Sequence, residues 1–245
     1  MRKLLVVVAV LALPGMALAQ TIIDSPHDLS SGSTASVASA GQQSQVCWYC
    51  HVPHNARITR AVWNRADTTE NFGTWGAGWT NTIAGTTLPT GVLPGEGSRR
   101  CFSCHDGTSL IGNVFYGTNV TDLTNTAAGA MDPARGSVVD PGNMANNHPV
   151  SVPYPPVADN PAGTYQGNTT GVTDTTDWQT IANAEAAGVI FYQDAGLTNG
   201  VECASCHDPH AYGAGYVFTH ALIDGSAICI ACHNKWRRNC QQLQC

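Results

Sequence analysis

The sequence has few charges, and those it has lean toward the acidic side. Charged residues make up 11% of its 245 residues, against roughly 25% in an average soluble domain. Acidic residues outnumber basic ones by 17 to 11, so the chain lacks the basic footprint that nucleic-acid binding requires. Such a neutral surface is compatible with extensive burial against other copies of the chain, and equally with a solvated surface rich in Thr, Asn and Gly.

Long apolar runs are also missing, apart from one at the N-terminus that is too short to cross a bilayer. Residues 4–13 are apolar and follow two basic residues, and residues 17–19 have the small-x-small pattern of a signal-peptide cleavage site. A membrane-spanning helix needs about 20 apolar residues. We therefore predict a signal peptide over residues 1–19, no membrane span, and a secreted chain that begins at Gln20.

Cysteine is abundant instead: the chain has ten, and eight of them belong to four Cys-x-x-Cys-His units, here called motifs 1 to 4. A lone Cys-x-x-Cys pair also fits a redox dithiol or half of a zinc site. Four copies, each followed by histidine in an exported chain, instead predict covalent attachment of four c-type haems, here numbered I to IV after their motifs. In each motif the thiols would add to the haem vinyl groups and the histidine would bind the iron. The motif residues are Cys47, Cys50 and His51; Cys101, Cys104 and His105; Cys203, Cys206 and His207; and Cys229, Cys232 and His233.

Two cysteines remain outside the motifs, near the end of the chain. Cys240 and Cys245 would lie in a compartment that permits disulfides if the chain is exported. We expect them to pair with each other, and free thiols or a bridge between subunits are the alternatives.

Methionine is too scarce to supply second axial ligands to four irons, because only Met131 and Met144 lie outside the leader. The histidines outside the motifs are His27, His54, His148, His210 and His220. Their number favours bis-histidine ligation throughout, which leaves no open iron position for a substrate. We expect the first four to be iron ligands. The fifth, His220, is the expected surplus residue, with a role in packing or in binding a haem propionate.

His54 follows the histidine of motif 1 by only three residues, in the sequence CWYCHVPH. Axial ligands of one iron approach from opposite faces of the haem, whereas helical residues three apart lie on the same face, about 4.5 Å apart along the axis. Pro53 also favours extended backbone just before it. His54 must therefore serve a different haem from His51, or none. Motif 3 repeats this spacing with His210, which favours ligands that couple neighbouring haems.

Turn-forming residues dominate most of the chain between the motifs. Gly, Pro, Thr, Asn and Ser prevail in the stretches 21–46, 76–98, 117–147 and 153–177, and this composition indicates loops. Regular structure is therefore expected in only a few places.

Three segments carry signals for regular structure. Residues 177–187 follow the threonines 175–176, which can cap a helix, and predict a short helix. Residues 189–192 and 201–203 predict two strands joined by a turn. This hairpin would lead directly into motif 3.

These signals predict a multihaem cytochrome c fold, with mostly irregular coil, short α-helices and a minor β-hairpin, organised around haems. Residues 20–245 would form a single tetrahaem domain, with a flexible N-terminal arm over residues 20–46 and a C-terminal tail over residues 236–245. Short helices would carry the motifs, notably over residues 228–235. The first cysteines of motifs 3 and 4 are only 26 residues apart, so haems III and IV should be close neighbours.

The chain resembles the extracellular tetrahaem cytochromes of metal-reducing bacteria, of the outer-membrane cytochrome E type, over residues 25–235. The resemblance lies in the segments SPHDLS, VCWYCHVPHN, CFSCHDGTS, NNHPVSVPY, ECASCHDPH and GSAICIACHNK. It implies a continuous stack of bis-histidine haems in a filament, in which His54 ligates a haem of the next subunit, III or IV and by preference III. It also implies that His210 serves haem IV, while His27 and His148 serve haems I and II.

The expected function is extracellular electron transfer along a homopolymer built by head-to-tail contacts. Its partners would be other electron-transfer cytochromes or extracellular acceptors, at the cell surface or beyond it. The alternative is a soluble periplasmic tetrahaem shuttle whose ligands all come from one chain. A multihaem reductase is a third class, but it needs an open iron site. The spare histidines outnumber the irons, so we expect an electron-transfer protein and no enzyme.

Overall fold

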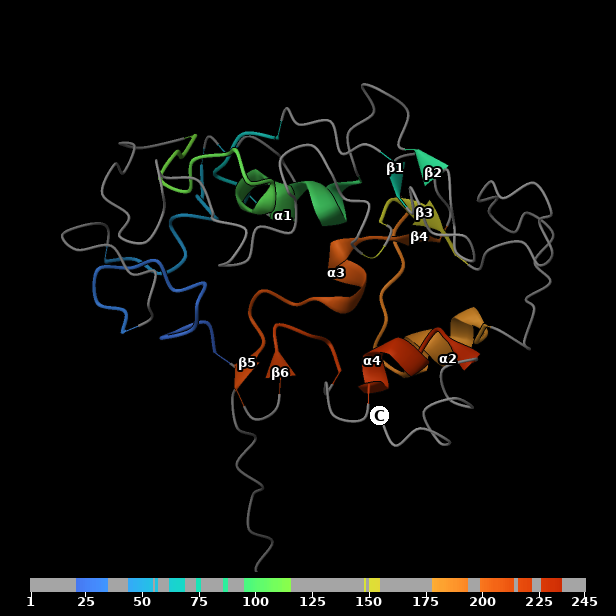
Figure 1. Ribbon diagram of the computed structural model, residues 1–245. Coiled ribbons are helices and arrows are strands. Elements are labelled where there is room, and N and C mark those ends of the chain that lie inside the picture. The colour runs from blue at the N-terminus through green and yellow to red at the C-terminus, as the bar shows by residue number, and fades with distance from the viewer. Residues whose placement is uncertain are drawn as a thin grey trace, which may run out of the picture.

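Figure 1 shows the computed structural model of the chain, whose described residues form short helices and two-residue strands with turns and coil around them. In the part that the structure describes, the longest helix has ten residues. This coil-rich architecture with few short helices confirms what the turn-forming composition predicted. The structure describes residues 21–34, 44–54, 56, 62–68, 74–75, 86–87, 95–115, 148, 150–154, 178–193, 199–213, 216–221 and 226–234.

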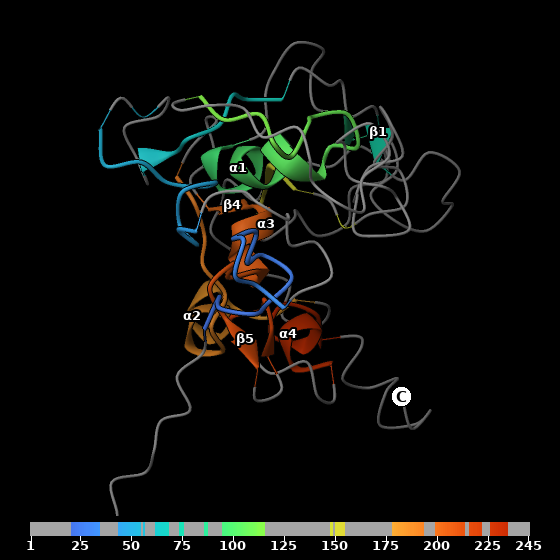
Figure 2. The ribbon, with the colours of Figure 1, turned by 90° about the vertical axis from the view of Figure 1, so that its left-hand side faces the viewer.

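The helices and strands are small and occur in chain order as follows. The helices are α1 (Glu96–His105), α2 (Ile181–Ala186), α3 (Cys203–Cys206) and α4 (Ala227–Ile230). The strands form three antiparallel pairs: β1 (Thr74–Trp75) with β2 (Thr86–Thr87), β3 (Val152–Pro153) with β4 (Gly200–Val201), and β5 (Tyr212–Gly213) with β6 (Tyr216–Val217). In both ribbon views α3 lies between α1 and the α2–α4 pair (Figures 1 and 2).

Helix α1 carries motif 2 and is anchored at both of its ends. It begins after Gly95, whose backbone N–H donates to the Ser151 hydroxyl at 2.9 Å. Glu96 in the first turn interacts favourably with the helix dipole and pairs with Arg100 at 3.1 Å. Phe102, inside the motif, is fully buried. The helix thus holds motif 2 against the interior of the protein.

Motif 4 lies where two small apolar clusters meet. Cys232 packs against both of them. The first cluster consists of Ala184, Val189 and Ala231, and the second of Val152, Tyr154 and Val201. The first cluster joins α2 to α4, and the second joins the β3–β4 pair to motif 4.

The helix predicted over residues 177–187 is present in its central part, as α2. The observed cap is Thr180, whose hydroxyl accepts from the backbone N–H of Asn183 at 3.2 Å. The threonines 175–176 were the predicted cap. The later start follows from Trp178, which forms an antiparallel bridge with His233 and therefore stays extended.

Of the hairpin predicted for residues 189–192 and 201–203, one antiparallel bridge is found, between Tyr192 and Gly200, which directly precedes the second segment. Strand β4 pairs instead with β3, where the Val201 carbonyl accepts from Ser151 at 2.7 Å. The second strand also ends early, because Glu202 forms a capping box with Ser205 and starts α3. A minor hairpin does occur further on, as β5 and β6.

None of the helices in the described segments is long and apolar enough to cross a membrane. Several predictions concern residues outside those segments. These are the signal peptide over residues 1–19, the disulfide between Cys240 and Cys245, and the scarce methionines Met131 and Met144.

Candidate functional site

Each motif closes one helical turn on itself, with or without a longer helix around it. In motif 1 the His51 N–H donates to the Cys47 carbonyl at 2.8 Å, although no helix forms there. The corresponding bond of His207 measures 3.0 Å in motif 3, and that of His233 measures 3.0 Å in motif 4. Motif 2 lies within α1. The first cysteine and the histidine, four residues apart, thus lie on the same face of one turn.

Motifs 1 and 2 lie next to each other through one cysteine of each. Burial raises the pKa of the Cys50 thiol to about 12, and the nearby Cys104 adds to this rise. The backbone brings the two segments together, because Asn64 donates to the Cys50 carbonyl at 2.9 Å and accepts from the Phe115 N–H beyond motif 2 at 2.6 Å.

Motifs 2 and 3 meet through their first cysteines. The Cys101 and Cys203 thiols are hydrogen-bonded, which raises the pKa of Cys101 well above its usual value and lowers that of Cys203. Ser98 of α1 strengthens the contact, because its hydroxyl donates to the Glu202 carboxylate and accepts from the Cys203 N–H at 2.8 Å. Helix α1 and helix α3 are therefore fixed against each other at the motifs themselves.

Motifs 3 and 4 meet through the other cysteine of motif 3. Burial raises the pKa of the Cys206 thiol to about 12, and Cys232 and Cys229 of motif 4 contribute further. This proximity agrees with the short spacing of the two motifs in the sequence. The motifs therefore form a row in the order 1, 2, 3, 4, in which each inner motif places one cysteine toward each neighbour.

Three motif histidines each face a histidine from elsewhere in the chain. The ring centroids of His27 and His105 are 5.9 Å apart, with the planes at 73°. Those of His51 and His210 are 6.2 Å apart, with the planes at 18°. Burial lowers the pKa of His27 to about 4, and the nearby His105 ring is the second largest cause of this fall. The imidazole of His27 is therefore neutral at pH 7, which is the form that binds metals.

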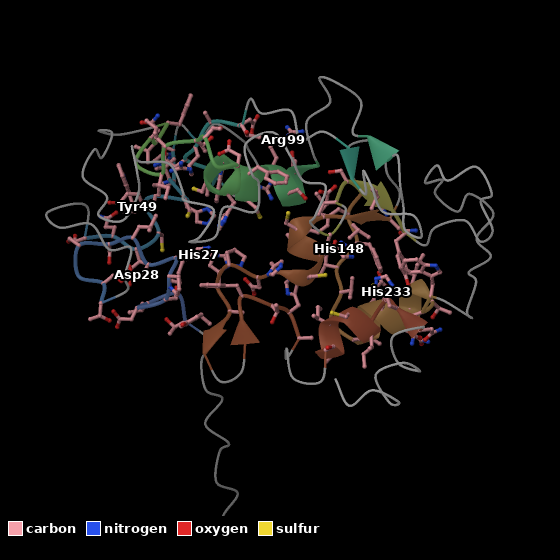
Figure 3. The ribbon with its side chains drawn as sticks, viewed as in Figure 1. His27, Asp28, Tyr49, Arg99, His148 and His233 are labelled. Carbon is pink, nitrogen blue, oxygen red and sulfur yellow. The ribbon has the colours of Figure 1, made fainter. Side chains whose placement is uncertain are left out.

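The third pair, His148 and His233, lies beside α2 and α4 (Figure 3). Their centroids are 6.3 Å apart, with the planes at 75°. Burial lowers the pKa of His233 to about 4, and the nearby His148 lowers it further. This ring, too, is neutral at pH 7.

The three separations fit an iron ion between the two rings of each pair. A metal–imidazole nitrogen bond is about 2 Å long, so two rings on opposite sides of one ion have centroids roughly 6.3 Å apart. The observed distances run from 5.9 to 6.3 Å. The donor set also fits, because the eight motif cysteines are free thiols, none joined to another in a disulfide.

This pairing differs from the one implied by the resemblance. His210 was expected at haem IV, but it faces His51 of motif 1. His148 was expected at haem I or II, but it faces His233 of motif 4. His27 faces motif 2, which is one of its two expected places.

Motif 3 differs from the other motifs in the surroundings of its histidine. His207 is exposed, and among the described residues it forms no ring pair like the three above, although it lies near enough to His27 to help lower the pKa of that ring. His54, the fourth predicted ligand, is exposed as well. The structure thus places three motif histidines each beside one of the expected distal histidines, and it pairs neither His54 nor His207 in this way among the described residues.

Second-sphere contacts fix which ring nitrogen of several histidines is available to a metal. His207 donates from Nδ1 to the Phe218 carbonyl at 2.9 Å, and His27 donates from Nδ1 to the Pro209 carbonyl at 3.3 Å. His210 donates from Nδ1 to the Asp208 carboxylate at 3.2 Å. Because these oxygens only accept, each ring presents the lone pair of Nε2.

Two tryptophans support the outer motifs, and sequence reasoning missed both. Trp63 forms a bridge with His51, with ring centroids 5.6 Å apart. Trp178 forms the same kind of bridge with His233, with centroids 4.5 Å apart. Nothing in their local sequence marks them. Asp208, by contrast, precedes His210 by two residues, and this spacing could have indicated it as a hydrogen-bond partner of the His210 ring.

His220 is bonded to the backbone of motif 3. Its N–H donates to the Cys206 carbonyl at 2.9 Å, and its ring Nε2 donates to the Ala204 carbonyl at 3.0 Å. These contacts fit the packing role expected for a surplus histidine.

Residues 195–238, which contain motifs 3 and 4, match the family of the doubled CXXCH motif. This match supports a multihaem c-type cytochrome. The CXXCH pair indicates covalently bound c-type haem, and with it electron transfer. Motifs 1 and 2 have the same sequence pattern outside the matched range. No curated protein matches the chain.

Proposed function

We propose that this multihaem cytochrome carries electrons outside the cell through four bis-histidine haems, in a filament of head-to-tail subunits. The observation that carries the proposal is the set of three histidine pairs whose ring centroids are 5.9–6.3 Å apart. The histidine of the remaining motif, His207, is exposed and belongs to none of these pairs. Three haems would obtain both ligands from their own chain. The fourth would obtain one ligand from a neighbour.

Within one chain, the ring pairs support one assignment of the ligands. Haem I would be held by His51 and His210, and haem II by His105 and His27. Haem IV would be held by His233 and His148. The short distances between cysteines of successive motifs support four haems in a row, close enough for electrons to pass between them.

Haem III would be held by His207 of its own chain and by His54 of the next subunit. One finding supports this assignment: the other expected ligands already face other motifs. His54 and His207 are also exposed, as are His148 and His210, so a neighbouring subunit could reach both rings. His54 is too close to His51 to serve haem I, as the spacing argument requires. A ligand donated in this way makes a heterologous interface, and such interfaces build open helical assemblies unless they close into a ring.

The residues of the chain would bind, orient and separate the cofactors, while bound haem c supplies the one-electron chemistry. The cysteines attach each haem at two points. The neutral rings of His27 and His233 are ready to bind metal without losing a proton at pH 7. With two histidines on every iron, no position stays open for a substrate, which is why we propose electron transfer without catalysis.

The test compares His54→Ala with His220→Ala in secreted, haem-loaded protein. We expect the His54 variant to be monomeric, with one of four haems high-spin, because haem III loses its second ligand. The His220 variant should keep four low-spin haems and form filaments. Negative-stain microscopy and visible or electron paramagnetic resonance spectra give the two readouts. If the His54 variant still forms filaments with four low-spin haems, the donated ligand is excluded and the proposed assembly fails. If the unmodified protein has four low-spin haems and forms no filaments, a periplasmic shuttle with all ligands in one chain replaces it.

A further inference from the structure

Arg65 is a fully buried cation that neither the motif pattern nor the proposed ligation explains. It is 2% exposed, and it is the largest of the fully buried side chains in the described segments. A guanidinium stays charged at every physiological pH. Burial of such a charge is costly unless its hydrogen bonds are satisfied, so its position needs a reason.

The hydrogen bonds of Arg65 hold its charge in place without neutralising it. Nε and Nη2 donate to the Ser103 carbonyl at 3.1 and 2.9 Å. Nη1 donates to the Ile111 carbonyl at 2.5 Å, and Nη2 also donates to the Leu110 carbonyl at 2.9 Å. These acceptors are neutral carbonyls. Within the described part of the chain, no carboxylate forms an ion pair with Arg65.

Arg65 lies between motifs 1 and 2. Its chain neighbour Asn64 donates from its backbone to the Cys50 carbonyl of motif 1 at 2.9 Å. Its acceptor Ser103 directly precedes Cys104 of motif 2. Residues 64–65 are therefore tied to the backbone at or directly before the second cysteine of both motifs.

Arg65 is also close to the sulfur atoms that would attach the haems. Its positive charge acts on both Cys50 and Cys104. The guanidinium also hydrogen-bonds the Cys104 sulfur. Asp106 acts in the opposite direction on Cys104, but its effect is smaller than that of Arg65.

Motif 3 has the opposite electrostatic surroundings. Glu202 directly precedes Cys203, is 1% exposed, and raises the pKa of that thiol. Its carboxylate accepts from the hydroxyls of Ser98 and Ser151. Motifs 1 and 2 thus share a buried cation, whose effect at Cys104 exceeds that of the buried Asp106 carboxylate, whereas a buried carboxylate directly precedes motif 3.

We propose that Arg65 raises the reduction potentials of haems I and II and makes them the sites where electrons reside preferentially along the row. The inference rests on the proposed haem attachment. An added electron lowers the positive charge of an iron centre, so a nearby fixed cation stabilises the reduced form. A unit charge about 10 Å away at an effective dielectric constant of about 20 shifts such an equilibrium on the order of tenfold. Arg65 is a positioning residue in this scheme, because its charge acts on the haem without touching a reacting atom.

The experiment is a spectroelectrochemical titration of the haem-loaded protein, in which an electrode supplies one electron to each haem. We compare Arg65→Gln, which removes the charge, with Arg65→Lys, which keeps it. Arg99→Gln is the control, because it removes a partly exposed cation of α1, 3.9 Å from Asp67. Haem content and spin state are measured on the same samples, so that loss of haem or of a ligand is recognised separately.

The expected result is a fall in the midpoint potentials of two of the four haems in Arg65→Gln, by about 59 mV for a tenfold change in each equilibrium. Arg65→Lys and Arg99→Gln should titrate like the unmodified protein. An Arg65→Gln titration that coincides with the wild type, with four low-spin haems present, overturns the inference and leaves the proposed function standing. If fewer haems are found in the wild type, the proposed function itself fails.

Arg65→Gln also leaves carbonyl groups of Ser103, Leu110 and Ile111 without their donor, and the variant can fail to fold. In that case the test uses the wild-type protein, in which paramagnetic nuclear magnetic resonance at successive stages of reduction gives the order in which the haems are reduced. Haems I and II should be reduced before haems III and IV. Reduction of haem III or IV first would overturn the inference.

Discussion

The rings of His51 and His210 lie nearly parallel, at 18°, with centroids 6.2 Å apart, although one belongs to motif 1 and the other follows motif 3. His210 stands three residues after His207, just as His54 stands three residues after His51. In motif 3, the second histidine of the repeated Cys-x-x-Cys-His-x-Pro-His unit therefore lies beside the histidine of a different motif. The same reasoning, applied to His54, points to a haem outside its own motif.

Replacement of His210 by alanine should convert haem I to a high-spin form while the filament persists. The haem then loses a ligand from its own chain, whereas the contact between subunits is untouched. Resonance Raman or electron paramagnetic resonance spectra, with the altered haem assigned by its paramagnetic resonances, give the measurement. A high-spin haem IV with haem I unchanged would favour the pairing implied by the resemblance and contradict the observed ring geometry.

Replacement of Asp208 by alanine should raise the midpoint potential of haem I. The Asp208 carboxylate accepts from Nδ1 of His210 at 3.2 Å, and such a contact makes the imidazole a more basic ligand, which favours ferric iron. We expect a change of up to tenfold in the equilibrium, about 59 mV for one electron. Redox titration is the measurement. Asp24→Ala, which removes an exposed carboxylate bonded to Thr34, is the control and should leave all four potentials in place.

Replacement of Asp106 by alanine should lower the free energy of unfolding by about 3 kcal/mol, because a fully buried acceptor of charge-assisted bonds is lost. The carboxylate accepts from the Thr68 hydroxyl at 2.5 Å and from the Ser109 hydroxyl at 2.6 Å. It also accepts from the backbone N–H groups of Thr108 and Ser109. Urea unfolding of the loaded protein, followed by far-ultraviolet circular dichroism, measures the effect. A midpoint equal to that of the wild type would show that this network does not hold residues 62–68 to motif 2.

Replacement of Gly97 by alanine should destabilise the contact between motifs 2 and 3. A Cβ atom at this position would lie 2.9 Å from Cβ of Glu202 and 3.2 Å from Cζ of Tyr192. Overpacking of this kind costs about 1–3 kcal/mol, and the better helix propensity of alanine returns about 1 kcal/mol. We therefore expect a lower unfolding midpoint. Gly32→Ala is the matched control, since its Cβ would meet nothing within 4 Å. Equal midpoints for the two variants would mean that α1 can move away from α3 without cost.

Short-range patterns predicted the parts of this protein that depend on neighbouring residues. The four motifs, the number of spare histidines and the helix at Ile181–Ala186 all follow from spacings of a few residues. The hairpin predicted for residues 189–192 and 201–203 does not extend beyond one bridge, because Glu202 forms the capping box of α3 and β4 pairs with the distant β3.

The pairing of histidines and the role of Arg65 could not be predicted, because both depend on contacts between distant segments. His148 and His233 meet only after the chain has folded, and no local pattern distinguishes the partner of one distal histidine from that of another. Arg65 has acceptors near residues 103 and 111, which no sequence rule connects to it. Asp208 is the exception, since its place beside His210 could have indicated a carboxylate–histidine pair.

The most direct test of the central claim is a density map of the native secreted protein at a resolution that resolves side chains. We predict haem III with His207 from its own chain on one side and His54 from the adjoining subunit on the other, repeated at every interface of a filament. A map in which all eight axial nitrogens around the four haems come from a single polypeptide would contradict the account.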